Sequence, residues 1–298
     1  HSAGSNSNTT IRMDELSNDR LMAVEAAAKA EGGISGYHLP WTTLNLIAGG
    51  FHPTEYLLLA GDTGKGKTWT ISEIANFFDF QELSTLLVSL EMSPLEFSQR
   101  IACLKGGFDY NDYLFGTFSE KEMERYKEFE RTQWKNSKII FSDHAKVTTV
   151  EELEILIRAH NPKILIVDGV DLLDDTKNSQ AWEKLKRVSR QLKQLSLRYN
   201  LFTIGTTQLK PVAENEQTQD LAFYRGQKQD VNYLFALISN KRMEEMQLRQ
   251  LHCWKARKGQ PRNVEFNFRI RECDFTETRE INLFTSGEPD EDAPLEYE

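Results

Sequence analysis

Short runs of consecutive apolar residues alternate with stretches of helical periodicity along most of this chain. Such runs are typical of strands buried on both faces, whereas apolar positions three or four apart are typical of helices with one buried face. The sequence predicts strands at residues 56–60, 85–90, 138–141, 163–167, 201–206 and 231–238. It predicts helices at residues 13–29, 95–104, 119–135, 150–159 and 181–199, and another after residue 68. This alternation predicts an α/β fold with a mainly parallel sheet and helices on both faces.

The last third of the chain departs from this alternation. Residues 210–229 are polar without periodicity, and a loop of that length inside a compact domain is usually functional or disordered. Residues 248–254 and 264–270 are predicted strands joined by a basic tip at 255–262. These features predict antiparallel strands and a hairpin toward the C-terminus.

One stretch between a predicted strand and a predicted helix carries a phosphate-binding pattern. Gly61, Asp62, Thr63, Gly64, Lys65, Gly66, Lys67 and Thr68 match G-x-x-x-x-G-K-[ST] at every position. A glycine-rich turn can match by chance, but the preceding strand and the following helix disfavour that alternative. Glycines let backbone N–H groups face an anion, Lys67 would reach the β- and γ-phosphates, and Thr68 would ligate Mg²⁺. The chain is therefore predicted to bind ATP, or another nucleoside triphosphate, with Mg²⁺.

Two further predicted strands end on carboxylates. The apolar run 163–167 is followed by Asp168, about a hundred residues after the phosphate-binding loop, and this is the Walker B pattern for ordering Mg²⁺. The run 85–90 is followed by Glu91. Because ligands bind at the carboxyl ends of strands in open parallel sheets, both acids are candidate site residues.

Composition and charge bound the remaining possibilities. The formal net charge is −9, but residues 286–298 hold six acids and no Lys or Arg, so the rest of the chain has 36 basic against 39 acidic residues. A body this close to neutral excludes a broadly basic nucleic-acid binder and leaves room only for a local patch. Residues 1–33 are expected to be a disordered tail plus a helix, residues 34–285 one domain, and residues 286–298 a disordered acidic tail.

The predicted helix 13–29 has two equally supported interpretations, because it could pack on its own domain or on a neighbouring subunit.

The chain begins with His1 and Ser2, so we expect a tag remnant or a fragment of a longer protein. The three cysteines lack metal-ligand spacing and are expected to be reduced thiols. No apolar run is long enough to span a bilayer, so we expect no membrane partner and a cytoplasmic location in a bacterial or phage-infected cell, or in an organelle matrix.

Taken together, the order of these stretches resembles the RecA-like motor domain of DnaB-type replicative hexameric helicases and of bacteriophage primase-helicases. The resemblance spans residues 36–268 and rests on the phosphate-binding loop, VSLEMS around Glu91, ILIVDGVDLL around Asp168, and the segment 189–209 that ends in TTQL. It continues through YRGQKQDVNYLFALI from Tyr224 and KARKGQP from Lys255. It implies a ring-forming, hexameric homo-oligomer that hydrolyses ATP and translocates on single-stranded DNA during replication.

The resemblance also implies roles for individual residues. Glu91 would orient the attacking water, and Gln208 would sense the γ-phosphate. Arg257, helped by Lys255, would reach the neighbouring subunit's site as an arginine finger. Each has a plainer interpretation: Glu91 as a residue near a helix start, Gln208 as a polar strand end, and Arg257 as a solvated turn residue.

Two loops would grip DNA in the ring channel, at residues 174–180 and 210–229, with Lys177, Lys210, Arg225 and Lys228 as candidate contacts. Acidic residues in both loops leave neither strongly basic. The acidic tail would recruit a replisome partner such as a primase, polymerase or loader, or would only aid solubility. Two other functions stay open: a RecA- or KaiC-like assembling ATPase without unwinding, and a nucleotide-gated scaffold or loader. Glu91 disfavours the scaffold, because a binding module needs no base to activate water.

Overall fold

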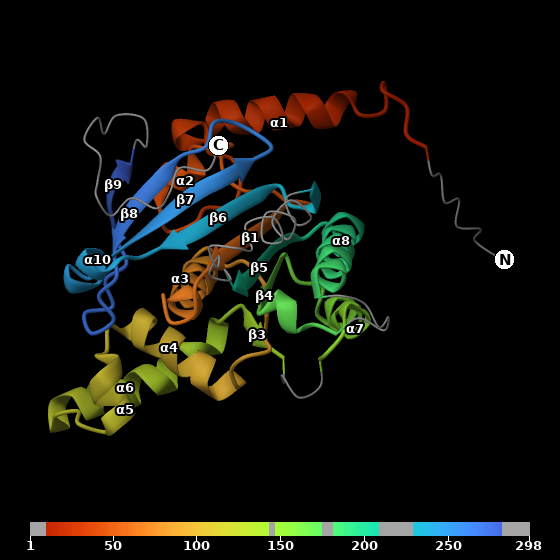
Figure 1. Ribbon diagram of the computed structural model, residues 1–298. Helices are drawn as coiled ribbons and strands as arrows, with labels where there is room; N and C mark the ends of the chain where they lie inside the picture. The colour runs from red at the N-terminus through yellow and green to blue at the C-terminus, as the bar shows by residue number, and fades with distance from the viewer. Residues whose placement is uncertain (1–9, 143–146, 175–180, 209–228, 282–298) are drawn as a thin grey trace, which may run out of the picture.

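The computed structural model describes residues 10–142, 147–174, 181–208 and 229–281, and its framework is one twisted sheet (Figure 1). The described strands follow the order β3-β2-β4-β5-β1-β6-β7-β8-β9. Pairing is parallel from β3 to β6 and antiparallel from β6 to β9. The strands are β1 (Tyr56–Gly61), β2 (Thr85–Ser89), β3 (Ile139–Phe141), β4 (Ile164–Asp168), β5 (Phe202–Gln208), β6 (Tyr233–Ile238), β7 (Leu248–Ala256), β8 (Asn263–Asn267) and β9 (Glu277–Ile281). The predicted fold class is confirmed, including the late antiparallel strands.

Alternate residues of each parallel strand belong to two separate cores, one on each face of the sheet. Leu57 and Leu59 of β1 pack in the core under α3 (Lys67–Phe80) and α4 (Pro94–Gly106). Tyr56 and Leu58 pack in the core under α7 (Val150–His160) and α8 (Ala181–Tyr199). The strands therefore read as continuous apolar runs, because both of their faces are covered.

Shorter elements complete the described chain. They are α1 (Ser17–Lys29), η1 (Glu31–Gly33), α2 (Thr42–Asn45), α5 (Tyr110–Phe115), α6 (Glu120–Thr132), η2 (Trp134–Asn136), η4 (Val170–Leu172) and α10 (Lys241–Glu245). No helix in these described ranges is long and apolar enough to cross a membrane.

Several boundaries differ from the sequence prediction. Helix α1 begins at Ser17 and not at residue 13, while β5 continues to Gln208 and β4 includes Asp168. Strand β9 and helix α10 were not anticipated: β9 is polar and lies at the sheet edge, and α10 has only one buried residue, Met243. Apolar periodicity gives little signal for elements of this kind.

Helix α1 has no buried residue and lies along the outside of the domain (Figure 1). Its side chains Leu21, Met22 and Val24 are exposed, as are Met13 and Leu16 just before it. A helix whose apolar side chains face solvent has no packing against its own domain to stabilise it. The structure therefore disfavours the interpretation in which α1 packs on its own domain.

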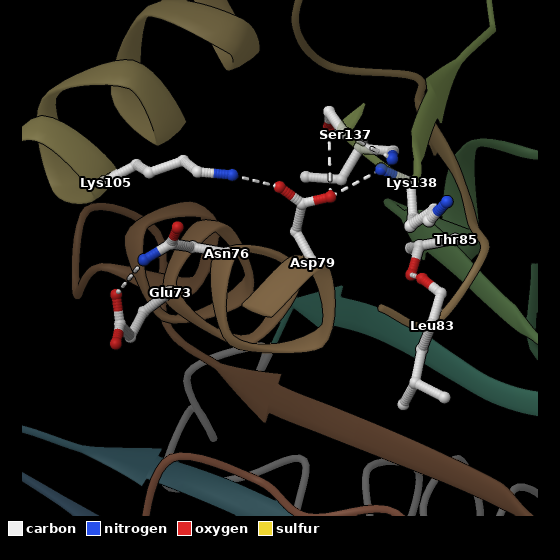
Figure 2. A network of polar contacts seen from close by, with 9 residues as sticks. Glu73, Asn76, Asp79, Leu83, Thr85, Lys105, Ser137 and Lys138 are labelled. Atoms are coloured by element: carbon white, nitrogen blue, oxygen red, sulfur yellow. Dashed lines mark hydrogen bonds and ion pairs between the residues drawn. The ribbon is translucent and has the colours of Figure 1, made fainter. Parts of the chain in front are cut away.

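A buried carboxylate joins the far end of α3 to the edge of the sheet (Figure 2). Asp79 of α3 pairs with Lys105 of α4 and accepts hydrogen bonds from Ser137 Oγ at 3.0 Å and from the Lys138 amide at 2.5 Å. Its side chain is almost fully enclosed. Because three separate segments meet on this one group, Asp79 fixes how α4 and β3 sit against the helix that begins at the phosphate-binding loop.

Candidate functional site

The phosphate-binding loop connects the end of β1 to the start of α3, as predicted. Gly64 and Gly66 both have positive φ, at 77° and 105°. A Cβ on Gly66 would lie 2.3 Å from the ring of Phe268, so this position accepts only glycine. The loop is thus held in a shape that presents its N–H groups at the start of a helix, where an anion is favoured.

Lys67 is buried at the centre of the loop. Its ammonium donates to the carbonyl oxygens of Gly61 at 2.8 Å and Asp62 at 3.0 Å. Burial lowers the pKa of Lys67, and the negative charges of Glu91 and Asp168 oppose that shift. The sequence-predicted cation and the two predicted carboxylates therefore belong to one electrostatic cluster.

Asp168 is buried at the end of β4 and is held from the neighbouring strand β5. Thr206 Oγ1 donates to Asp168 Oδ1 at 2.7 Å, and Ser89 Oγ of β2 lies 3.5 Å from Oδ2. Burial raises the pKa of Asp168, and the Glu91 charge raises it further, against the hydrogen bond from Thr206. A carboxylate oriented this tightly is suited to order a cation that restores its ionised form.

Glu91 and Gln208 lie together at the carboxyl ends of the parallel strands. Gln208 Nε2 donates to Glu91 Oε1 at 3.4 Å, and Thr63 Oγ1 of the phosphate-binding loop lies 3.4 Å from Gln208 Oε1. Gln208 therefore connects the loop to the candidate base. The separation of Glu91 and Gln208 in sequence is bridged because parallel strands end at a common edge.

Two charged residues of this site were missed by sequence reasoning. Asp171 of η4 has a buried Oδ1 with no hydrogen-bond partner in the described residues, and burial together with the Glu91 charge raises its pKa. Arg100 of α4 lies over the ring of Trp69 at 5.1 Å, and its buried Nε also has no partner there. The signal for Asp171 was its position three residues after Asp168, whereas Arg100 is one charge among several on its helix.

A cavity of about 340 Å³ is lined in part by residues that contact the phosphate-binding loop. Its lining includes Glu244, Arg249 and Phe268, and the Arg249 guanidinium lies 4.4 Å from the Phe268 ring centroid. Arg249 Nε donates to the Lys65 carbonyl at 3.0 Å, and Lys65 pairs with Glu244 at 2.7 Å. The loop and the cavity wall are therefore one connected structure.

Lys255 and Arg257 lie at the other end of the strands, away from the phosphate-binding loop. Ala256 pairs with Tyr233, which pairs with Leu57 at the beginning of β1. At about 3.3 Å per residue, the end of β1 at Gly61 is about 13 Å further along the strand. Lys255 Nζ donates to the Val231 carbonyl at 2.8 Å, and Arg257 donates to the Gln229 carbonyl. The structure does not bring these two residues to the phosphate-binding loop of their own chain.

The donors for a metal ion fit Mg²⁺. Thr68 offers a hydroxyl at the start of α3, and Asp168 offers a carboxylate, both oxygen ligands of the type that Mg²⁺ prefers. Within the described ranges there is no cluster of three His, Cys, Asp or Glu able to hold a metal ion. Mg²⁺ is usually held by one or two protein groups together with phosphate oxygens, and Thr68 and Asp168 would supply the protein groups. The predicted DNA contacts Lys177, Lys210, Arg225 and Lys228 lie outside the described residues.

Comparison with known proteins identifies a family. The family described as "DnaB-like helicase C terminal domain" matches residues 36–277. A replicative DNA helicase DnaB of Synechocystis is 25% identical over 215 residues, which cover 70% of this chain and 23% of the relative. The DnaB of Mycoplasma genitalium is 25% identical over 222 residues, covering 70% of this chain and 46% of the relative. The chain thus spans less than half the length of these two relatives.

Solved structures show the same fold. The ATPase domain of G40P has a TM-score of 0.78 at 21% identity and covers 89% of this chain and 99% of that one. A DnaB-like replicative helicase, whose structure is described together with its interactions with primase, has a TM-score of 0.73 at 20% identity, covering 90% of this chain and 67% of that one. A KaiC-like protein from Pyrococcus horikoshii has a TM-score of 0.54 at 18% identity, covering 80% and 96%.

Proposed function

We propose, from the premise that this chain belongs to the DnaB-like helicase C terminal domain family, that it is the ATP-hydrolysing motor of a ring helicase acting on single-stranded DNA. The family match covers most of the domain that carries the site. The observation that carries the proposal is the separation of the site into two halves. Lys67 and Glu91 lie at the carboxyl ends of the parallel strands, and Arg257 lies at the opposite ends. Such a site is completed only when a second copy supplies Arg257.

Nucleotide binding is assigned to the phosphate-binding loop and the adjoining cavity. Lys67 and the loop N–H groups would hold the β- and γ-phosphates, and the base and ribose would enter the cavity beside Phe268 and Arg249. Thr68 and Asp168 would hold Mg²⁺, which neutralises charge on the phosphates when bound. Asp62, Thr63, Gly64 and Lys65 complete the loop that surrounds the phosphates.

Hydrolysis is assigned to Glu91, which would accept a proton from the attacking water. Gln208 bonds to Glu91 and also contacts Thr63, so it is suited to report the γ-phosphate to the segment that follows β5. Arg100, stacked on Trp69, adds a second cation beside Asp168 and is a candidate to contact the phosphates. This set supports an enzyme and not a scaffold.

Assembly is assigned to two surfaces of different chemistry. One is Arg257, with Lys255, reaching into the neighbour's nucleotide site. The other pairs the exposed apolar side chains of α1 with the apolar groove of the next subunit. That groove has a volume of about 420 Å³, is lined by Leu95, Tyr113, Tyr126, Trp134 and Ile139 among others, and lies beside the edge strand β3. Together they predict a closed homo-oligomer, and we propose a hexamer.

The proposed DNA contacts are the two loops at residues 174–180 and 210–229, whose copies would converge in a ring.

The acidic residues 286–298 are proposed to recruit a basic partner from the replication machinery. Deleting residues 286–298 should leave ATP hydrolysis stimulated by single-stranded DNA intact and weaken binding to that partner. Loss of hydrolysis in the deletion would instead make the tail part of the motor.

Mixing two inactive variants tests the shared site. The Lys67→Ala chain retains Arg257 but loses the lysine that contacts the phosphates. The Arg257→Ala chain retains an intact phosphate-binding loop but supplies no arginine to its neighbour. Each alone should lose hydrolysis by about 10³-fold or more. Mixtures should recover activity, with a maximum at intermediate ratios and loss on dilution. Absence of recovery, with and without single-stranded DNA, in samples shown by size to be mixed assemblies would refute the finger in trans.

A further inference from the structure

The basic hairpin tip at residues 255–262 is fastened to the segment that leads into β1. A Cβ on Gly259 would lie 1.4 Å from the carbonyl oxygen of Ile47, and Gly259 has a φ of +68°. The tip therefore presses directly on the backbone before β1, and a side chain at this position would force the two apart. The Arg257 amide also donates to the Asn232 carbonyl at 2.9 Å, which fixes the tip to the start of β6.

A buried carboxylate holds the tip from below. Glu55, the residue before β1, is 2% exposed, and its Oε1 pairs with Lys258 Nζ at 2.8 Å. It also accepts from the Tyr233 hydroxyl at 3.3 Å and from the His52 amide at 2.9 Å. Lys258 is adjacent to Arg257, so this ion pair acts within one residue of the guanidinium.

Glu55 interacts with two cations near the tip, Lys258 and Lys193. Lys193 of α8 donates to the Thr54 carbonyl at 2.5 Å, next to Glu55. Burial lowers the pKa of Lys193, and the positive charges of Arg257 and Lys258 lower it further, while Glu55 opposes them. Glu55 therefore opposes the repulsion that Arg257 and Lys258 exert on Lys193, and removing its charge would leave that repulsion less opposed.

We propose that Glu55, acting through Lys258, is a positioning residue for the arginine finger Arg257. This inference rests on the proposed role of Arg257 in the neighbouring subunit. Glu55 precedes β1, at the end of the strand away from the phosphate-binding loop of its own chain. It holds the tip against β1 so that the guanidinium of Arg257 is presented from one place on the surface of its own chain.

The position of Glu55 also connects the hairpin tip to the nucleotide site of the same chain. Glu55 lies at one end of β1 and the phosphate-binding loop at the other, so a single buried strand joins the finger that a subunit donates to the loop with which it binds its own nucleotide. A shift of β1 on nucleotide binding would be carried to the tip by the Glu55–Lys258 pair. Neighbouring sites would then be coupled through this pair.

Directional complementation tests the role. Glu55→Gln removes the charge but keeps one acceptor oxygen for the His52 amide, and its Nε2 can donate to the Tyr233 hydroxyl, which can also accept. The change is placed in turn in each partner of the Lys67→Ala and Arg257→Ala mixture. In the Lys67→Ala chain, which donates the finger, it should reduce the recovered hydrolysis by at least about 10-fold, a fraction of the 10³-fold effect of a complete finger. In the Arg257→Ala chain, which donates only the loop, it should leave recovery within about 2-fold. A residue that only stabilises the fold has no reason to act in one direction.

The matched control is Glu280→Gln, which removes the 2.9 Å pair between Arg262 of the same tip and Glu280 of β9 and should have no effect in either position. Lys258→Met, a change at an exposed side chain, should reproduce the directional loss if Glu55→Gln lowers the yield of folded protein. Equal losses in both positions, or no loss in either, would overturn the positioning role. If the mixture without Glu55→Gln shows no recovery, the finger in trans itself fails, and the positioning role fails with it.

Discussion

Replacing the exposed apolar side chains of α1 should weaken assembly without unfolding the domain. Leu21, Met22 and Val24 are 58%, 67% and 67% exposed, so roughly three-fifths or more of each is available for burial against a neighbour. Full burial of such a side chain contributes about 1.5–3 kcal/mol, which gives about 4 kcal/mol for the three together. Changing all three to Gln, a good helix former, should therefore weaken each subunit interface by about a thousandfold.

Sedimentation velocity over a range of protein concentrations, with a non-hydrolysable nucleotide and Mg²⁺, measures this change. The matched control changes Ile155 of α7 and Leu197 of α8 to Gln, because these are 65% and 57% exposed on other helices and should leave assembly unaltered. Neither set should change the denaturation midpoint of the domain appreciably. An α1 variant that assembles over the same concentration range as the parent would refute the docking of this helix.

The groove side offers a second test of the same contact. Leu95 lines the groove and is 66% exposed, so Leu95→Gln should also weaken assembly. If α1 docks in that groove, combining Leu95→Gln with the α1 changes should cost less than the two effects added, because both remove the same contact. Full additivity would place α1 elsewhere.

Three other changes have outcomes fixed by single groups. Lys67→Ala should abolish hydrolysis and weaken nucleotide binding, whereas Glu91→Gln should still bind ATP but hydrolyse it at least about 100-fold more slowly; a parental rate in Glu91→Gln would mean that another residue is the base. Asp79→Ala should destabilise the domain by about 3 kcal/mol in urea unfolding, because it removes a buried charge bonded to Lys105 and to two further donors; a change under about 1 kcal/mol would contradict this. Burial raises the pKa of Glu73 to about 7, so its folded-state carboxyl binds a proton that the unfolded chain has lost, and stability should fall as the pH rises from about 4.5 to 7. Glu73→Gln should accordingly stabilise the domain at pH 8 more than at pH 5, and equal effects at both would refute the assignment.

The parallel part of the fold was predictable because its strands are covered on both faces. Runs such as 56–60 and 164–167 then contain only apolar residues, and the phosphate-binding loop and the carboxylate that follow them lie at the same ends of the parallel strands. The edge strand β9 and helix α10 were not predictable in this way, because they bury few side chains and so leave little apolar periodicity in the sequence.

The site was predictable where a residue type is required by its local geometry. Gly66 is required by the approach of Phe268, and the motif around Lys67 is contiguous. Asp171 and Arg100 were missed because their relation to Glu91 and Asp168 arises only when separate elements pack together. Glu55 was missed for the same reason, since an acid before a strand has no pattern of its own.

Strand displacement on a forked DNA, measured together with particle size in the same sample, tests the motor most directly. With ATP and Mg²⁺ the parent chain should form a hexamer-sized species and displace the strand. Glu91→Gln should form the same species on the fork and displace nothing. Displacement by a species smaller than a ring, or hexamer-sized assemblies whose ATP hydrolysis is stimulated by single-stranded DNA without displacement, would contradict the account, and the latter would favour a RecA- or KaiC-like ATPase.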